Sequence, residues 1–148
     1  LENDGVWVDT YMQTSHEDIF AVGDIASFYN EALGKRMRVE HEDAAKSMGE
    51  IAGANMAGAT KPYDYLPYFY SDMFDLSYEA LGELNTELDT IIDAENEFEK
   101  AVVYYLKDDK IRGVLLWNVW EKLDEARALI QSQEKFDADS LKGKIALN

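Results

Sequence analysis

Gly23 and Asp24 follow a compact apolar run at residues 19–22, and together they form the first arrangement that suits binding chemistry. The run predicts a buried strand, and ligands of open α/β sheets bind outside the carboxyl ends of the strands. Gly23 would let the backbone approach a ligand, and Asp24 would offer a carboxylate to the hydroxyls of a sugar or polyol. The same pair is also compatible with a simple turn.

A second arrangement, Glu40, His41 and Glu42, opens a segment with helical spacing. A helix N-terminus presents free N–H groups and a partial positive charge, so it suits a ligand edge that carries negative charge. The alternative is an ordinary capped helix with exposed acids. His16, the remaining histidine, lies in a polar turn, where we expect it to be exposed and inert.

The third arrangement is aromatic, with Phe69 and Tyr70 leading into Ser71 and Asp72. An aromatic stripe of the core is the alternative interpretation. Ser71 does not predict a hydrolase, because no nucleophile-elbow motif or partnered histidine accompanies it. The dispersed histidines also lack metal-ligand spacing, so we predict no metal site.

The elements that must position these residues follow from hydrophobic periodicity. A short strand is predicted at residues 6–8. A helix is predicted from about residue 42 to Ala57-Gly58. Gly49, Ala52 and Gly53 give this helix a face of small residues, where a sheet or a ligand could approach closely.

A domain boundary is predicted at about residue 62, since Thr60-Lys61-Pro62 resembles a linker and no Lys or Arg occurs between Lys61 and Lys100. Residues 1–62 and 63–148 would then be separate domains. In the second domain we predict a half-buried strand at residues 77–84 and two strands, at 98–106 and 111–120, that are joined by a hairpin loop. A helix at 124–133 and a short helix or frayed tail at 139–147 are predicted to follow. These elements indicate an α+β fold.

Composition excludes several classes of function. The chain has 148 residues, 47% of them hydrophobic, with a net charge of -16. This acidity disfavours nucleic acid and anionic membranes, whereas it suits a basic protein partner or a solvated surface. Disulfides and cysteine-ligated metal sites are excluded because the chain has no Cys, and a cytoplasmic location fits. No apolar run approaches the roughly 20 residues needed to span a bilayer.

Several motifs, in this order, resemble the C-terminal part of the FAD-dependent pyridine nucleotide-disulfide oxidoreductase superfamily. The likeness is strongest to the apoptosis-inducing-factor-like and the rubredoxin- or ferredoxin-reductase-like proteins. The motifs are Thr14-Ser15 with Ile19–Asp24, Val39-Glu40-His41, Lys61-Pro62-Tyr63, Phe69–Asp72 and Val114–Asn118. The resemblance implies that residues 1–62 are the end of an FAD-binding domain. It also implies that residues 63–148 form the reductase C-terminal domain, an antiparallel sheet with flanking helices.

The resemblance assigns roles to individual residues. Gly23 and Asp24 would meet the ribityl chain of FAD. Backbone groups around Glu40, His41 and Glu42 would meet the pyrimidine edge of the flavin. Phe69 and Tyr70 would wall the flavin site, although Tyr70 stands where the family often has Trp.

The activity implied by the resemblance is hydride transfer from NADH or NADPH to FAD, followed by electron transfer to an acceptor. No G-x-G-x-x-G motif occurs, so the phosphate-binding segments are expected outside this chain, which alone should be inactive. Expected partners are a rubredoxin- or ferredoxin-type carrier, or a second copy through residues 63–148. The alternative function is a docking or dimerisation module with no catalytic role.

Overall fold

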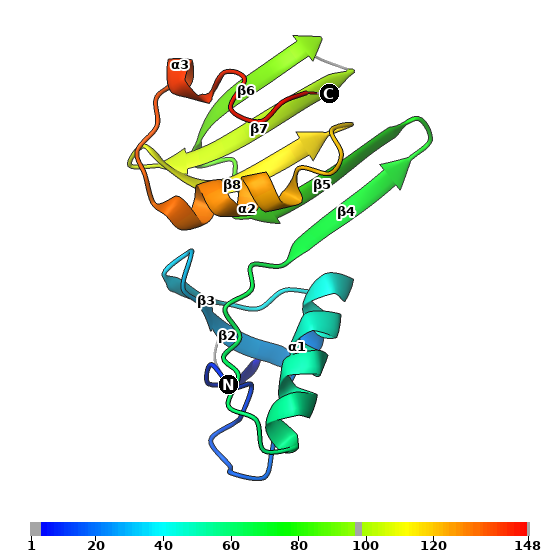
Figure 1. Cartoon of the computed structure of the whole chain (residues 1–148), viewed down its shortest axis with the longest axis vertical. Coiled ribbons are helices and arrows are strands. Elements are labelled where there is room, and N and C mark those ends of the chain that lie inside the picture. The colour runs from blue at the N-terminus through cyan, green and yellow to red at the C-terminus, as the bar shows by residue number, and fades with distance from the viewer. Residues whose placement is uncertain (1–3, 97–98, 148) are drawn as a thin grey trace. The chain divides into compact units, whose positions relative to one another are not determined.

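The computed structural model describes residues 4–96 and 99–147, and the chain folds as two compact units, Leu1–Pro67 and Tyr68–Asn148 (Figure 1). The sequence predicts the boundary slightly earlier, near residue 62. Residues just beyond that point pack into the first unit: Tyr63 is buried, and its backbone N–H donates to the carbonyl of Thr10 over 2.7 Å. Its ring also meets Phe28 edge-on, with centroids 5.4 Å apart.

The first unit is a small sheet with one helix. Strands β1 (Val6–Trp7) and β2 (Ala26–Asn30) are parallel, and β3 (Lys35–Met37) pairs with β2 as an antiparallel hairpin. Helix α1 (Glu42–Met56) begins and ends where the periodicity predicts. Its buried side chains share the core with those of the sheet and the first loop, the largest being Met12, Phe28 and Met48.

The prediction of a strand at residues 19–22 is wrong. The run forms only an isolated bridge, between Phe20 and Gln13, and its backbone bonds to the preceding loop, with Ala21 donating to Met12 over 3.1 Å. Hydrophobicity is a sound guide to burial at Ala21, but Ile19 is 52% exposed. The Gly-Asp pair therefore does not follow a strand. It lies in a single 3-10 turn, η1 (Gly23–Ile25), which precedes strand β2.

The two glycines of the small-residue face on α1, Gly49 and Gly53, have no neighbour within their unit, whereas its third member, Ala52, is buried in the core. Ala44, Met48 and Ala52 are the buried side of the helix. A Cβ atom added at Gly49 or Gly53 would have no neighbour within 4 Å. The close approach expected at these glycines is therefore absent from the part of the chain that the structure describes.

The second unit is a five-stranded antiparallel sheet of order β4-β5-β8-β7-β6 with two helices, which confirms the predicted α+β class. The strands are β4 (Tyr68–Met73), β5 (Leu76–Gly82), β6 (Asp89–Asn96), β7 (Lys100–Lys107) and β8 (Lys110–Trp117), and the helices are α2 (Leu123–Ser132) and α3 (Ala138–Leu141).

The β7–β8 hairpin turns where the sequence predicts. Asp108 and Asp109 both have positive φ, 54° and 66°, as a type I′ turn requires. Phe98, where the sequence predicts that the strand corresponding to β7 begins, lies outside the described residues. The sequence patterns do not predict strands β4 and β6.

The two faces of this sheet differ in covering. On one side, Tyr104 is buried, where Glu125 of α2 and the backbone of Ile145 approach it. The opposite side, which we call the open face, carries a row of half-buried aromatic rings. Phe69 meets Tyr78 edge-on at 6.1 Å, and Tyr78 stacks on Trp117 at 6.3 Å.

Candidate functional site

Gly23 fixes the position of the η1 turn against helix α1. Its φ is +69°, in the left-handed region that favours glycine, and a Cβ atom there would lie 3.4 Å from Cβ of Ala45. Its backbone N–H also points to Sδ of Met48, at 3.4 Å. The Gly-Asp turn is therefore held against the first turns of the helix.

Asp24 is exposed, and its backbone is tied to the segment that leads into α1. Arg38 donates from Nη1 to the Asp24 carbonyl over 3.0 Å and to the Glu40 carboxylate over 2.9 Å. Among the described residues, no hydrogen-bond donor reaches the Asp24 carboxylate. The turn thus fixes the aspartate backbone and leaves its carboxylate for another partner.

His41 is the residue that precedes α1, and its side chain does not cap the helix. Burial lowers the pKa of its imidazole, while the negative charges of Asp43 and Asp24 oppose this shift. The imidazole is therefore neutral at neutral pH. The neutral ring adds no positive charge to that of the backbone N–H groups at this helix end.

Glu42 opens the helix as an exposed anion. Its carboxylate lies 2.6 Å from Nζ of Lys46, one helical turn later, and this hydrogen bond lowers the pKa of Glu42. Both side chains are about two-thirds exposed or more, so the pair contributes little to stability.

Gly23, Asp24, Glu40, His41 and Glu42 thus lie together in the first unit, although about 15 residues separate the two motifs. We call these five residues the turn–helix site. The arrangement can hold a polyol near a carboxylate and an anionic edge near a helix N-terminus.

Phe69 and Tyr70 belong to the second unit, on strand β4, and point to opposite sides of its sheet. Phe69 lies on the open face with Tyr78. Tyr70 pairs with Glu79, which pairs with Leu116 on the helix-covered side, and it is 55% exposed at the sheet edge. Since side chains alternate along a strand, a single flat ligand cannot use both rings from one side.

Sequence reasoning missed a cavity of about 470 Å³ in the first unit, between α1 and residues 62–65. Tyr65 donates from its hydroxyl to Asp43 over 3.3 Å, and the hydroxyls of Ser47 and Tyr63 lie 3.1 Å apart. No sequence motif marks it, because its walls come from a helix flank and an irregular segment.

No group of His, Asp or Glu in the described ranges could hold a metal ion. Within the same ranges, no helix is long and apolar enough to cross a membrane.

Comparison with known proteins places this geometry in a family context. Residues 91–132 match the family described as apoptosis-inducing factor, mitochondrion-associated, C-term. Apoptosis-inducing factor 1, mitochondrial, of Dictyostelium discoideum is 36% identical over 140 residues, which cover 86% of this chain and 26% of that protein. Monodehydroascorbate reductase 3 of Arabidopsis thaliana is 40% identical over 124 residues, covering 78% and 28%.

Solved structures agree with these relatives. A ferredoxin reductase from Rhodopseudomonas palustris superimposes with a TM-score of 0.78 at 27% identity, covering 91% of this chain and 33% of its own. The reductase of a covalent putidaredoxin reductase–putidaredoxin complex gives a TM-score of 0.78 at 25% identity, with coverages of 91% and 32%.

The chain therefore spans only about a quarter to a third of the proteins that it matches. The matched family segment, the ordered motifs and the shared fold nonetheless agree with one another. The chain is therefore similar, over most of its own length, to apoptosis-inducing factors, monodehydroascorbate reductases and ferredoxin reductases.

Proposed function

We propose that the complete protein is a flavin-dependent oxidoreductase that passes hydride from NADH or NADPH to FAD and electrons onward to an acceptor. In this proposal the present chain completes the FAD site. The observation that carries it is the convergence of the Gly23-Asp24 turn with the N-terminus of α1. The reductase names of the relatives support the same class of activity.

FAD, when bound, supplies the redox chemistry, and the turn–helix site binds and orients it. The Asp24 carboxylate accepts hydrogen bonds from the ribityl hydroxyls, and Gly23 allows the backbone to come close. Backbone groups of Glu40, His41 and Glu42 meet the pyrimidine edge, where the helix N-terminus favours the negative charge that reduction brings. The residues present fit this role, because the Asp24 carboxylate is exposed and the His41 side chain does not cap the helix.

On the second unit, Phe69 is the ring that we assign to the flavin on the strength of its sequence motif. It lies on the open face, where it meets Tyr78 edge-on and Tyr78 stacks on Trp117. Tyr70 would contribute only from the sheet edge.

The test is an FAD titration of the complete protein that contains this chain, followed by flavin fluorescence. A charged hydrogen bond is worth about 1.5–3 kcal/mol, so Asp24→Asn should weaken FAD binding by roughly 10- to 100-fold. Asp18→Asn, an exposed acid in the polar loop, is the matched control and should bind as the parent does. Unchanged affinity in Asp24→Asn would refute its role, and a complete protein that ignores FAD would refute the oxidoreductase function.

The open face also supports a second candidate, a docking or dimerisation role for the second unit. Ile92 is 60% exposed in a row with the half-buried Val103 and Leu115, and the aromatic row lies beside it. A rubredoxin- or ferredoxin-type carrier or a second copy are the proposed partners. The captured putidaredoxin complex of a structural neighbour supports the carrier. Sedimentation of the chain without flavin tests self-association, since a tight dimer would favour the second copy and a monomer would exclude it.

A further inference from the structure

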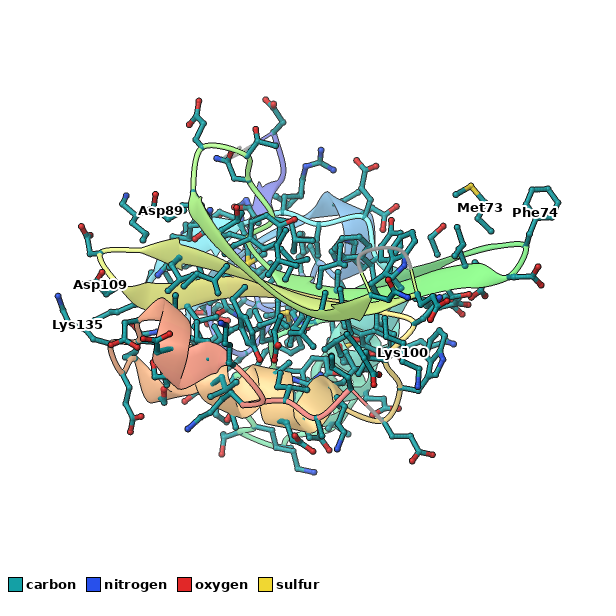
Figure 2. The ribbon with its side chains drawn as sticks, turned by 90° about the horizontal axis from the view of Figure 1, so that it is seen from above. Met73, Phe74, Asp89, Lys100, Asp109 and Lys135 are labelled. Atoms are coloured by element: carbon teal, nitrogen blue, oxygen red, sulfur yellow. The ribbon has the colours of Figure 1, made fainter. Side chains whose placement is uncertain are left out.

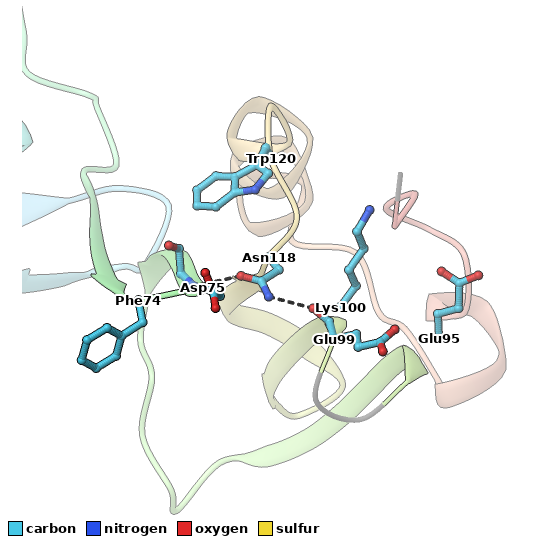
Figure 3. A pocket seen from close by; sticks show the side chains of 8 residues that line it. Phe74, Asp75, Glu95, Glu99, Lys100, Asn118 and Trp120 are labelled. Carbon is cyan, nitrogen blue, oxygen red and sulfur yellow. Dashed lines mark hydrogen bonds between the residues drawn. The ribbon is translucent and has the colours of Figure 1, made fainter.

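Besides the open face, the sheet unit carries a cavity of about 520 Å³ (Figure 3). It lies where the β4–β5 hairpin, the β6 end, the β7 start and the segment after β8 meet. The side chains that decide its chemistry are Phe74, Asp75, Glu95, Glu99, Lys100 and Trp120.

The floor of this cavity is held by Asn118. Its side-chain oxygen accepts from the backbone N–H of Ser77 over 2.8 Å, and its side-chain nitrogen donates to the carbonyl of Glu99 over 2.9 Å. Figure 3 shows both bonds. One amide therefore ties three strand ends together, so that the cavity is formed before any ligand arrives.

Aromatic and thioether side chains project beside the cavity. Phe74 is fully exposed at the tip of the β4–β5 hairpin, next to Met73, which is 57% exposed (Figure 2). Trp120 is 46% exposed on the cavity wall. Phe74 also has a positive φ of 57°, a conformation that asparagine or glycine adopts more easily. The phenyl ring therefore contributes no packing to this fold and sits where a smaller residue would suit the turn better.

Charge specifies what kind of molecule the cavity would accept. Asp75, Glu95 and Glu99 face it, and among the described residues Lys100 is the one cation in its wall. The surrounding hairpin and strand add no further positive charge, because no Lys or Arg occurs between Lys61 and Lys100. An aromatic face and carboxylates each attract a cation, and the planar guanidinium of an arginine can contact both at once.

We propose that this cavity and the Met73-Phe74 tip form a docking site for a basic protein partner. An arginine of the partner occupies the cavity, between the Trp120 indole and the carboxylates of Asp75, Glu95 and Glu99. Phe74 packs onto apolar surface of the same partner, as a buried aromatic anchor does within a polar rim. This docking site is independent of flavin binding.

The test uses this chain and a synthetic peptide of alternating arginine and leucine, with the glutamate–leucine peptide as the opposite-charge control. Residue-resolved NMR titration should shift Met73, Phe74, Asn118 and Trp120, with no response to the acidic peptide. The triple variant Asp75→Asn, Glu95→Gln, Glu99→Gln should weaken binding at least tenfold, and Phe74→Asn about fivefold.

Two matched controls separate a specific site from general attraction. Asp108→Asn with Glu134→Gln and Asp139→Asn removes the same charge from exposed positions elsewhere on the unit. Ile19→Asn removes an exposed apolar side chain that belongs to neither the cavity nor the open face. Both should bind within twofold of the parent. Equal weakening in the charge control, shifts spread over the whole acidic surface, or no binding at millimolar peptide would each overturn the proposal.

Discussion

The Gly23 backbone allows a sharp prediction, because two glycines of one unit should respond to alanine with opposite signs. Gly23 has φ +69°, whereas Gly53 lies inside helix α1, where an added Cβ atom would have no neighbour within 4 Å. A left-handed conformation costs an L-residue about 1–2 kcal/mol. Alanine in a helix interior is favoured over glycine by about 0.8–1.0 kcal/mol.

Gly23→Ala should therefore lower the free energy of unfolding of the first unit by about 1–2 kcal/mol. The new Cβ atom would meet Ala45 at 3.4 Å, which is contact without severe overlap, so little is added to the backbone cost. Gly53→Ala should raise the same quantity by about 1 kcal/mol. The two variants should then differ by about 2–3 kcal/mol, although each adds one methyl group.

Urea titration followed by NMR signals of buried Phe28 and Met48 reads the first unit separately from the second. Gly49→Ala is a second control and should resemble Gly53→Ala, because a Cβ atom at Gly49 would also have no neighbour within 4 Å. If Gly23→Ala proves as stable as the parent, then the left-handed turn does not exist in solution. The assignment of Gly23 as the residue that pins the turn–helix site would then fail.

Two further predictions concern buried groups of the sheet unit. Burial raises the pKa of Glu79, and one of its carboxylate oxygens has no partner among the described residues. The protonated carboxyl therefore contributes stability that is fully present below about pH 4.5 and is lost as the pH rises through the raised pKa. Glu79→Gln should thus raise Tm by about 1–3 °C at pH 7 and leave it unchanged near pH 4, and an equal effect at both pH values would contradict this. Burial also raises the pKa of Tyr104 to about 12, and the Ile145 backbone approaches its hydroxyl without completing a hydrogen bond. Tyr104→Phe should therefore change stability by no more than about 1 kcal/mol and leave the tyrosinate absorbance at pH 11 unaltered, whereas a loss above about 2 kcal/mol would reveal a bond.

The elements that the sequence predicts well are those with one strongly buried side. Helix α1 and strands β7 and β8 carry apolar residues at the period of their own secondary structure. Strands β4 and β6 are the two edges of the sheet, with few fully buried side chains, so their patterns resemble those of polar loops. Periodicity reports burial, and edge strands have little of it.

The failed strand at residues 19–22 has a different physical cause. Its apolar residues suggest a sheet, but a strand needs a neighbour to accept its backbone hydrogen bonds. In the described part of the chain, the backbone of this run bonds instead to the preceding loop at residues 12–16. Pairing is a property of two segments, and one segment cannot reveal it.

The same distinction separates what could be known of the turn–helix site from what could not. Each motif is visible alone, as Gly23-Asp24 and as Glu40–Glu42. Their contact depends on the β2–β3 hairpin, which returns the chain to the η1 turn so that Arg38 reaches the Asp24 carbonyl. The aromatic run shows the converse: Phe69 and Tyr70 are neighbours in sequence, but strand β4 turns them to opposite sides of the sheet. Adjacent residues can therefore belong to different surfaces while distant motifs form one site, and only the pairing of strands decides which.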